Sequence, residues 1–488
     1  MANGVRIRRD IATLALWDDT VLWYARAVAR MKQRPLADPT GWRYQAAIHD
    51  FDPADDPLSG EGGTPPSQAD RDRYWSQCQH GSWYFLPWHR MYLACFEQIV
   101  AATIVELGGP ANWALPFWNY SDAANPDARR LPPAFREATL PDGAPNPLRV
   151  TQRRPGANTG SVIAGNQGVS LAGALAELRF AGVTGGSPGF GGGRTGFNHG
   201  GGNPGVLERV PHGSMHVAVG GDIDPVGWMS QFNTAGLDPL FWLHHGNIDR
   251  LWSVWRTQTP PRLDPTDAAW RNMAFEFHDG TGAPVQFTCA QVVNTEAAPL
   301  SYRYEGVPAL EGRPAVEGIP VAMEPPVPEM VGATQQPVVL QGRPAEARVA
   351  ITPPTGPARP ATESITEPPE IYLNIENVTG HGGPVTYAVY LNLPAGADPR
   401  QHQDRFVGVL PMFGVKEASR ADAKHPGSGL NYSLNAGKVI RRLQAEPGWN
   451  PADLRITFVP LREDEAPRPA VESLPAPIQV GRISVYYE

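Results

Sequence analysis

The chain has 488 residues, 18% of them charged, and a formal net charge of −8. This length favours roughly two to four domains and provides enough apolar residues for a sizeable core. The negative charge gives no electrostatic reason to expect nucleic acid or an anionic membrane as a partner. No stretch reaches the roughly 18 uncharged apolar residues that a membrane-spanning helix needs.

The cysteine content and the N-terminus bear on the cellular compartment. Cys78, Cys95 and Cys289 are too few for a disulfide framework, which favours a reducing compartment. The apolar run over residues 11–17 ends at Asp18 and is too short for the core of a secretory signal. We therefore expect a cytoplasmic protein.

The first 305 residues show helical spacing of apolar side chains. A first amphipathic helix is predicted from Leu14, Trp17, Val21, Leu22 and Ala25. A second, buried helix is predicted to follow His89 and to end at the glycines at 108 and 109. The glycine-rich stretch 184–205 predicts a long loop. We expect a mainly α-helical core over residues 1–305.

The composition changes after residue 305. Residues 306–369 are rich in proline and show little periodicity, which predicts an extended linker with room for short edge strands. Further on, β-branched and alternating segments predict strands over 370–378, 386–393, 405–410, 454–461 and 478–487. We therefore expect an all-β C-terminal domain, a small sandwich, over residues 370–488.

Seven of the twelve histidines lie in or near two stretches about 120 residues apart. In the second stretch, His212 and His216 are four residues apart, which places both rings on one face of a helix. Asp238 and Pro239 predict the start of another helix. On that helix His245 shares a face with core residues, whereas His244 points about 100° away. We therefore predict His245 as a metal ligand and His244 as its neighbour.

The first stretch offers three more imidazoles. His80 and His89 lie nine residues apart on either side of a turn, and His49 lies upstream in an apolar helical context. His49 considered alone also fits a hydrogen-bonded core histidine. Neutral imidazole suits copper, zinc, iron and nickel, so the residues alone leave the metal open.

Two long motifs around these histidines resemble the copper-binding signatures of the tyrosinase family. The first reads His80-x4-Phe85-Leu86-x-Trp88-His89-Arg90-x2-Leu93-x3-Glu97, and the second reads Asp238-Pro239-x-Phe241-Trp242-x2-His245-x3-Asp249. Tyr302 and Tyr304 resemble the tyrosine motif that closes the family's catalytic core. The resemblance covers residues 1–305.

The resemblance implies a type 3 centre with two copper ions. One copper would be held by His49, His80 and His89, and the other by His212, His216 and His245. Such a centre uses O2 to oxidise o-diphenols to o-quinones, and in some members it also hydroxylates monophenols at the ortho position. The partners expected are therefore O2 and a small phenol.

The resemblance also implies roles for residues around the metals. Cys78, two residues before His80, matches a cysteine that forms a thioether to that imidazole in some relatives, although a buried free thiol is the alternative. Phe232 matches a ring that lies over the second copper and gates the pocket, although a core phenylalanine is the alternative. Glu208 matches a carboxylate that orients a water.

Other expected roles concern the rim and the support of the ligands. Gly213 stands where strong monophenol hydroxylases carry an asparagine that helps hold this water, so strong hydroxylation is not expected. Val217 should make the rim apolar. We expect Asn247 and Asp249 to hydrogen-bond the ligating imidazoles from behind, because such rings usually donate their second N–H.

Several alternatives stay open from the sequence. The same site would serve an o-aminophenol oxidase, a haemocyanin-like O2 carrier or, with another metal, a zinc hydrolase. The C-terminal domain resembles in pattern the β-domain that covers the active site of latent plant and fungal relatives, and an oligomerisation or stability module is the alternative. A homo-oligomer is also left open.

Overall fold

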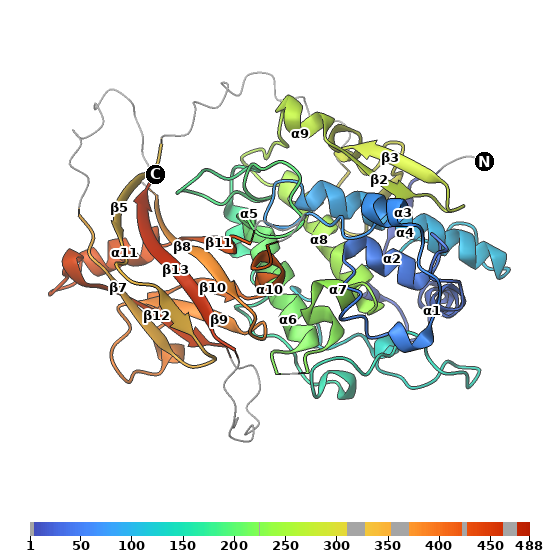
Figure 1. Cartoon of the computed structure of the whole chain (residues 1–488), viewed down its shortest axis with the longest axis horizontal. Helices are drawn as coiled ribbons and strands as arrows, with labels where there is room; N and C mark the ends of the chain where they lie inside the picture. The colour runs from blue at the N-terminus through green and yellow to red at the C-terminus, as the bar shows by residue number, and fades with distance from the viewer. Residues whose placement is uncertain (1–3, 224, 310–326, 353–369, 422–426, 462–475) are drawn as a thin grey trace.

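A computed structural model describes residues 4–223, 225–309, 327–352, 370–421, 427–461 and 476–488. Helices fill one side of the molecule and two β-sheets fill the other (Figure 1). The helical part comprises most of the N-terminal 305 residues and the sheets comprise the C-terminal part, as the sequence predicts.

The helical core is built around two long helices, α4 (Phe85–Glu106) and α8 (Leu240–Arg256), which pack against each other. Helix α1 (Asp19–Lys32) packs on α4 and α2 (Trp42–His49). The predicted buried helix after His89 is confirmed, but it begins at Phe85, so His89 lies inside its first turns. Helix α8 begins at Leu240, one residue later than predicted, with Pro239 at the cap, and Asp238 accepts a hydrogen bond from the amide of Leu240 at 2.9 Å.

Shorter elements complete this part. The remaining helices are α3 (Gln68–Tyr74), α5 (Ala172–Ala176), the π-helical turn η5 (Glu208–Gly213), α6 (Ser214–Gly220), α7 (Phe232–Ala235) and α9 (Ala268–Asn272). Strands β1 (Arg6–Arg8) and β4 (Tyr302–Tyr304) pair in parallel, and β2 (Ala274–His278) forms a hairpin with β3 (Pro284–Thr288). In the part of the chain that the structure describes, no helix combines the length and apolarity needed to cross a membrane.

Two antiparallel sheets form the C-terminal part. One has the order β11-β8-β13-β5, with β6 also paired to β13, and the other has the order β10-β9-β12-β7. The strands are β5 (Glu329–Ala333), β6 (Val338–Leu340), β7 (Ala345–Val349), β8 (Ile371–Gly380), β9 (Thr386–Leu391), β10 (Phe406–Pro411), β11 (Leu430–Asn435), β12 (Leu454–Pro460) and β13 (Ile478–Tyr487). Two helices, α10 (Val415–Ala418) and α11 (Gly437–Gln444), interrupt them.

The predicted linker over residues 306–369 contains short strands, as the sequence analysis left open, but they belong to the two β-sheets. Strands β5, β6 and β7 lie inside it, and they pair with the long strands β13 and β12. These three strands are only three to five residues long, so their own sequence carries little alternation, and the longer partner strands determine their pairing. The β-sheet part therefore begins near residue 329, and the rest of the predicted linker lies largely outside the described residues.

The helical part and the sandwich each have their own apolar core. One side chain from the C-terminal part belongs to the helical core. The helical core gathers side chains from residues 11–304, and the sandwich core gathers side chains from residues 331–485. Phe413, in the loop between β10 and α10, belongs to the helical core although its neighbours in sequence belong to the sandwich. This loop therefore inserts a C-terminal side chain into the N-terminal part.

Candidate metal centre

The six predicted ligands come from five separate elements. His49 ends α2, His80 lies just before α4, and His89 lies within α4. Of the other three, His212 lies in η5, His216 in α6 and His245 in α8. All six side chains are buried, with at most 3% of their surface exposed.

Backbone carbonyls fix the orientation of four of the six rings. In each of these, Nδ1 lies within 2.6–3.0 Å of a carbonyl oxygen and must donate to it, because the oxygen can only accept. The pairs are His49 with Phe232, His89 with Phe85, His212 with Glu208, and His216 with Met229. This tautomer leaves a lone pair on Nε2, the nitrogen that faces the centre, free to bind a metal.

The Nε2 atoms of these four rings have no hydrogen-bond partner among the described residues, and neither ring nitrogen of His80 or His245 has one. An unpaired polar atom in the interior is costly, and unpaired nitrogens on six neighbouring rings call for a common partner. Burial lowers the pKa of all six imidazoles, so they are neutral, as metal ligands must be.

The rings form two adjacent groups of three. In the first, ring centroids of His49, His80 and His89 are 5.2–5.8 Å apart. In the second, those of His212, His216 and His245 are 4.6–5.6 Å apart. The rings of His89 and His245 stack at 4.4 Å across the boundary between the groups. This donor set fits two metal ions side by side, each with three nitrogen ligands and an open position.

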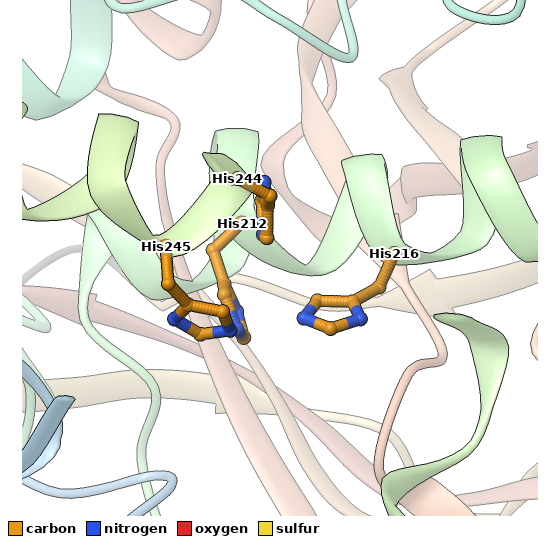
Figure 2. A group of neighbouring side chains, drawn as sticks. All are labelled: His212, His216, His244 and His245. Atoms are coloured by element: carbon orange, nitrogen blue, oxygen red, sulfur yellow. The ribbon is translucent and has the colours of Figure 1, made fainter. Parts of the chain in front are cut away.

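His244 also lies close to the second group. One potential ligand atom from each of His212, His216, His244 and His245 lies within 4.8 Å of the others. In Figure 2 the rings of His212 and His245 overlap, the ring of His216 lies beside them and that of His244 lies above them. The ring centroid of His244 is 4.9–5.4 Å from those of the other three, as close as these are to one another. The His244 ring is tilted against Tyr120 at 5.6 Å. That His245 ligates and His244 does not stays a prediction.

Glu208 lies beside both groups. Its Oε1 accepts a hydrogen bond from the amide of Gly81 at 2.7 Å, while Oε2 has no partner in the described structure. Burial raises the pKa of Glu208 to about 8. Gly81 has a φ of +62°, and a Cβ there would lie 1.7 Å from the carbonyl oxygen of Gly201, so only glycine fits.

Phe232 lies against the first group of rings and not over the second as expected, with its centroid 4.3 Å from that of His80 and 5.6 Å from that of His49. Gly213 faces the C-terminal part, and a Cβ at this position would lie 3.0 Å from Cγ of Pro411. Val217 differs from the prediction of an apolar rim. It lines a separate hollow with Thr386 and Leu461, because its side of α6 faces the sandwich.

Cys78 lies next to a histidine that the sequence analysis missed. Its Sγ is 3.2 Å from Nδ1 of His199, and it also lies near the nitrogens of His49 and His80. Nε2 of His199 lies 3.2 Å from Oδ1 of Asp50. Burial alone would raise the pKa of Asp50, but the hydrogen bond and charge of His199 outweigh it and lower this pKa. The glycine-rich surroundings of His199 carry no local signal for this contact.

Asn247 and Asp249 do not support the ligands as expected. In the described part of the chain, backbone carbonyls hold four of the six ligating rings instead, and Asn247 accepts from Arg250 at 2.9 Å. Asp249 is buried in an ionic network that joins α8 to α4, β1 and β4. Its carboxylate contacts Arg90, Arg8, Tyr302 and Tyr304. Asp249 therefore stabilises the packing of the helices that carry metal ligands. In the described structure its carboxylate contacts none of the six ligating imidazoles.

Phe413 covers the two groups of rings. Its ring stacks on His216 at 4.0 Å with an interplanar angle of 11°, and it lies 4.7 Å from Phe232. Gly414 follows with a φ of +80°, and a Cβ there would lie 2.7 Å from Phe232, so the turn requires glycine. The cavity left beside His80 and His212 has a volume of about 20 Å³, which has room for about one water but not for a phenol.

Ionic contacts hold helix α10, which follows Phe413, on the loop after His49. Lys416 pairs with Asp55 at 3.4 Å, and Arg420 pairs with Asp52 at 3.1 Å. Between them Glu417 is buried, and burial followed by the charge of Asp50 raises its pKa to about 7.

Comparisons with known proteins identify the class of protein. The common central domain of tyrosinase matches residues 39–180 and 179–258, the polyphenol oxidase middle domain matches 264–314, and a domain of unknown function matches 327–488. The tyrosinase HcTyr1 of Hahella sp. is 36% identical over 97% of this chain and 98% of its own length. A chloroplastic polyphenol oxidase of Malus domestica is 27% identical over 79% of this chain and 66% of its own length.

Solved structures share the fold. The latent apple tyrosinase matches 99% of this chain and 98% of its own with a TM-score of 0.62 at 22% identity. A latent aurone synthase matches 100% of this chain and 90% of its own with a TM-score of 0.63 at 22% identity. The chain therefore belongs to the tyrosinase family, whose members have a type 3 dicopper centre, and its homologues indicate a copper-dependent phenol oxidase.

Proposed function

We propose that this chain uses O2 to oxidise o-diphenols to o-quinones at a pair of copper ions held by His49, His80, His89, His212, His216 and His245. The observation that carries the proposal is the convergence of two groups of neutral imidazoles whose inward nitrogens lack any other partner in the described structure. When bound, the copper pair supplies the binding and reduction of O2 and accepts electrons from the phenol.

The chain's own residues would bind the phenol and move its proton. Phe232 offers a ring face against His80, on which an aromatic substrate stacks by offset geometry. The unpartnered Oε2 of Glu208 is the acceptor for the proton of the phenol hydroxyl, directly or through one water. Burial raises the pKa of Glu208, which makes its carboxylate a stronger base.

We expect monophenol hydroxylation to be weaker than diphenol oxidation. A phenol has a pKa near 10 and needs a base to bind as its anion. Gly213 has no side chain to help Glu208 hold a water at this place, and Pro411 packs where a side chain would extend. A diphenol depends less on such a water.

We further propose that the C-terminal part keeps the chain latent. The support is Phe413, which is 6% exposed and stacks on a predicted copper ligand while the remaining cavity is too small for a phenol. A phenol reaches the metals only after the loop over residues 411–414 moves away. Truncation of Phe413 to alanine tests whether this loop keeps the chain latent.

Oxygen uptake by the copper-loaded, activated chain tests the proposed reaction. Catechol, tyrosine and an o-aminophenol are compared at equal concentration, with His89→Ala as the control for metal loss. We expect fast uptake with catechol and slower uptake with tyrosine. Faster uptake with the o-aminophenol would make the chain an o-aminophenol oxidase. Reversible O2 binding without turnover of any compound would make it a carrier, and zinc in place of copper would contradict both.

A further inference from the structure

Arg209 brings a positive charge to the wall of the substrate cavity. It follows Glu208 in η5, and it lines the same cavity as His80, His212 and Phe232. Among the residues that line this cavity, Arg209 carries the positive charge and Glu208 is the acid. Since Glu208 is assigned to the phenol hydroxyl, Arg209 is left to recognise another part of a substrate.

The guanidinium group of Arg209 has few hydrogen-bond partners for a charged group in the wall of a cavity. Its Nη1 donates to the carbonyl oxygen of Val409 at 2.8 Å, and its Nε is buried without a hydrogen-bond partner. Within the described residues no carboxylate pairs with it. Burial lowers the pKa of Arg209 to about 10, so the group is still a cation at neutral pH. A partly buried cation without a counter-ion is costly, and an anionic ligand removes that cost.

The acceptor of Arg209 belongs to the part of the chain that covers the site. Val409 lies in β10, two residues before the loop that carries Phe413 into the pocket. This hydrogen bond uses Nη1, and the buried Nε keeps an N–H donor without a partner within the described residues. A planar guanidinium offers paired N–H donors that match a carboxylate.

We propose that Arg209 determines substrate specificity by binding a carboxylate, so that the preferred substrates are phenols that carry a carboxylate on a short side chain. This inference rests on the proposed phenol oxidation and names the substrate class of the same site. The aromatic ring lies between Phe232 and the metal ligands, and the side chain extends to Arg209 at the mouth.

A selectivity ratio tests the proposal in the full-length chain, with Phe413→Ala as the background that opens the pocket. We compare kcat/KM for 3-(3,4-dihydroxyphenyl)propionate with that for its uncharged methyl ester. Arg209→Gln should lower the acid-to-ester ratio about tenfold or more, mainly through KM for the acid, because a hydrogen bond between charged groups is lost. Arg209→Lys should keep part of the preference, and Arg209→Glu should favour dopamine over the acid.

A binding measurement gives a second readout that needs no turnover. Calorimetry with 3-phenylpropionate and its amide should show tighter binding of the acid by the copper-free Phe413→Ala chain, and Arg209→Gln in the same background should abolish the difference. Arg271→Gln, which removes an exposed arginine on α9, is the matched control and should leave both readouts as in the background.

Equal ratios and equal binding in the background and in Arg209→Gln would overturn the assignment of Arg209 while the proposed function stands. A chain that binds the acid through Arg209 but oxidises neither compound would overturn the proposed function, and with it the role of Arg209 in substrate choice.

Discussion

Removal of the Phe413 ring is the sharpest perturbation of the closed site. This side chain is 6% exposed, stacks on His216 at 4.0 Å and packs against Phe232 at 4.7 Å. Truncation of a buried phenylalanine to alanine costs about 3–5 kcal/mol. This loss destabilises the closed arrangement and not the open one, because the contacts of Phe413 with His216 and Phe232 exist only in the closed arrangement. At about 1.4 kcal/mol per tenfold change, a loss of about 3 kcal/mol raises the open fraction about a hundredfold.

The assay is the initial rate of oxygen uptake with 4-methylcatechol by full-length, copper-loaded protein without any activating treatment. We expect Phe413→Ala to be at least tenfold more active than the unchanged chain. Phe406→Ala is the matched control, because Phe406 packs on Tyr390 in the sandwich and does not reach the histidines. Equal rates for the unchanged chain and Phe413→Ala at equal copper content would refute the reasoning that this ring closes the site.

Three further predictions follow from the site. His245→Ala should lower the copper content and abolish oxidation, whereas His244→Ala should keep most of the copper. If metal analysis showed the reverse, His244 would be the ligand and His245 its neighbour. In the closed arrangement the pKa of Glu417 is raised to about 7, from about 4.3 for an exposed glutamate. As the pH rises between these two values, ionisation of Glu417 increasingly destabilises the closed arrangement, by roughly 3 kcal/mol above pH 7. Full-length Glu417→Gln should therefore be less active than the unchanged chain at pH 8 and equally latent at pH 4.5, and equal rates at pH 8 would count against this latch. Peptide mass analysis of copper-loaded protein should find Cys78 joined to His80 with the loss of two hydrogen atoms, and separate unmodified peptides would exclude the thioether.

The prediction of His212, His216 and His245 as ligands rests on local signals, whereas the full set of six comes from the family resemblance. The spacing of His212 and His216 places both on one side of a helical turn, and the face of α8 separates His245 from His244. The start of α8 was also predictable to within one residue, since Asp238 accepts a hydrogen bond from the amide of Leu240. Each of these inferences depends on geometry within one or two turns of a helix.

The parts that the sequence did not predict depend on distant contacts. Phe413 lies about 200 residues from His216 in the chain, and its own neighbours in sequence indicate only a turn after a strand. His199 reaches Asp50 and Cys78 only because a glycine-rich loop packs onto the first histidines. Asp249 was predicted to hold an imidazole, but two arginines from α4 and β1 compete for its carboxylate and form the stronger pair.

We expect two metal ions between the two groups of three imidazoles. Anomalous diffraction at the copper edge from crystals of the copper-loaded, full-length chain tests this expectation most directly. We predict two peaks at the bridging distance of about 3.5–4 Å, one contacted by Nε2 of His49, His80 and His89 and the other by Nε2 of His212, His216 and His245. A single peak, or a site completed by His244 in place of His245, would contradict the account.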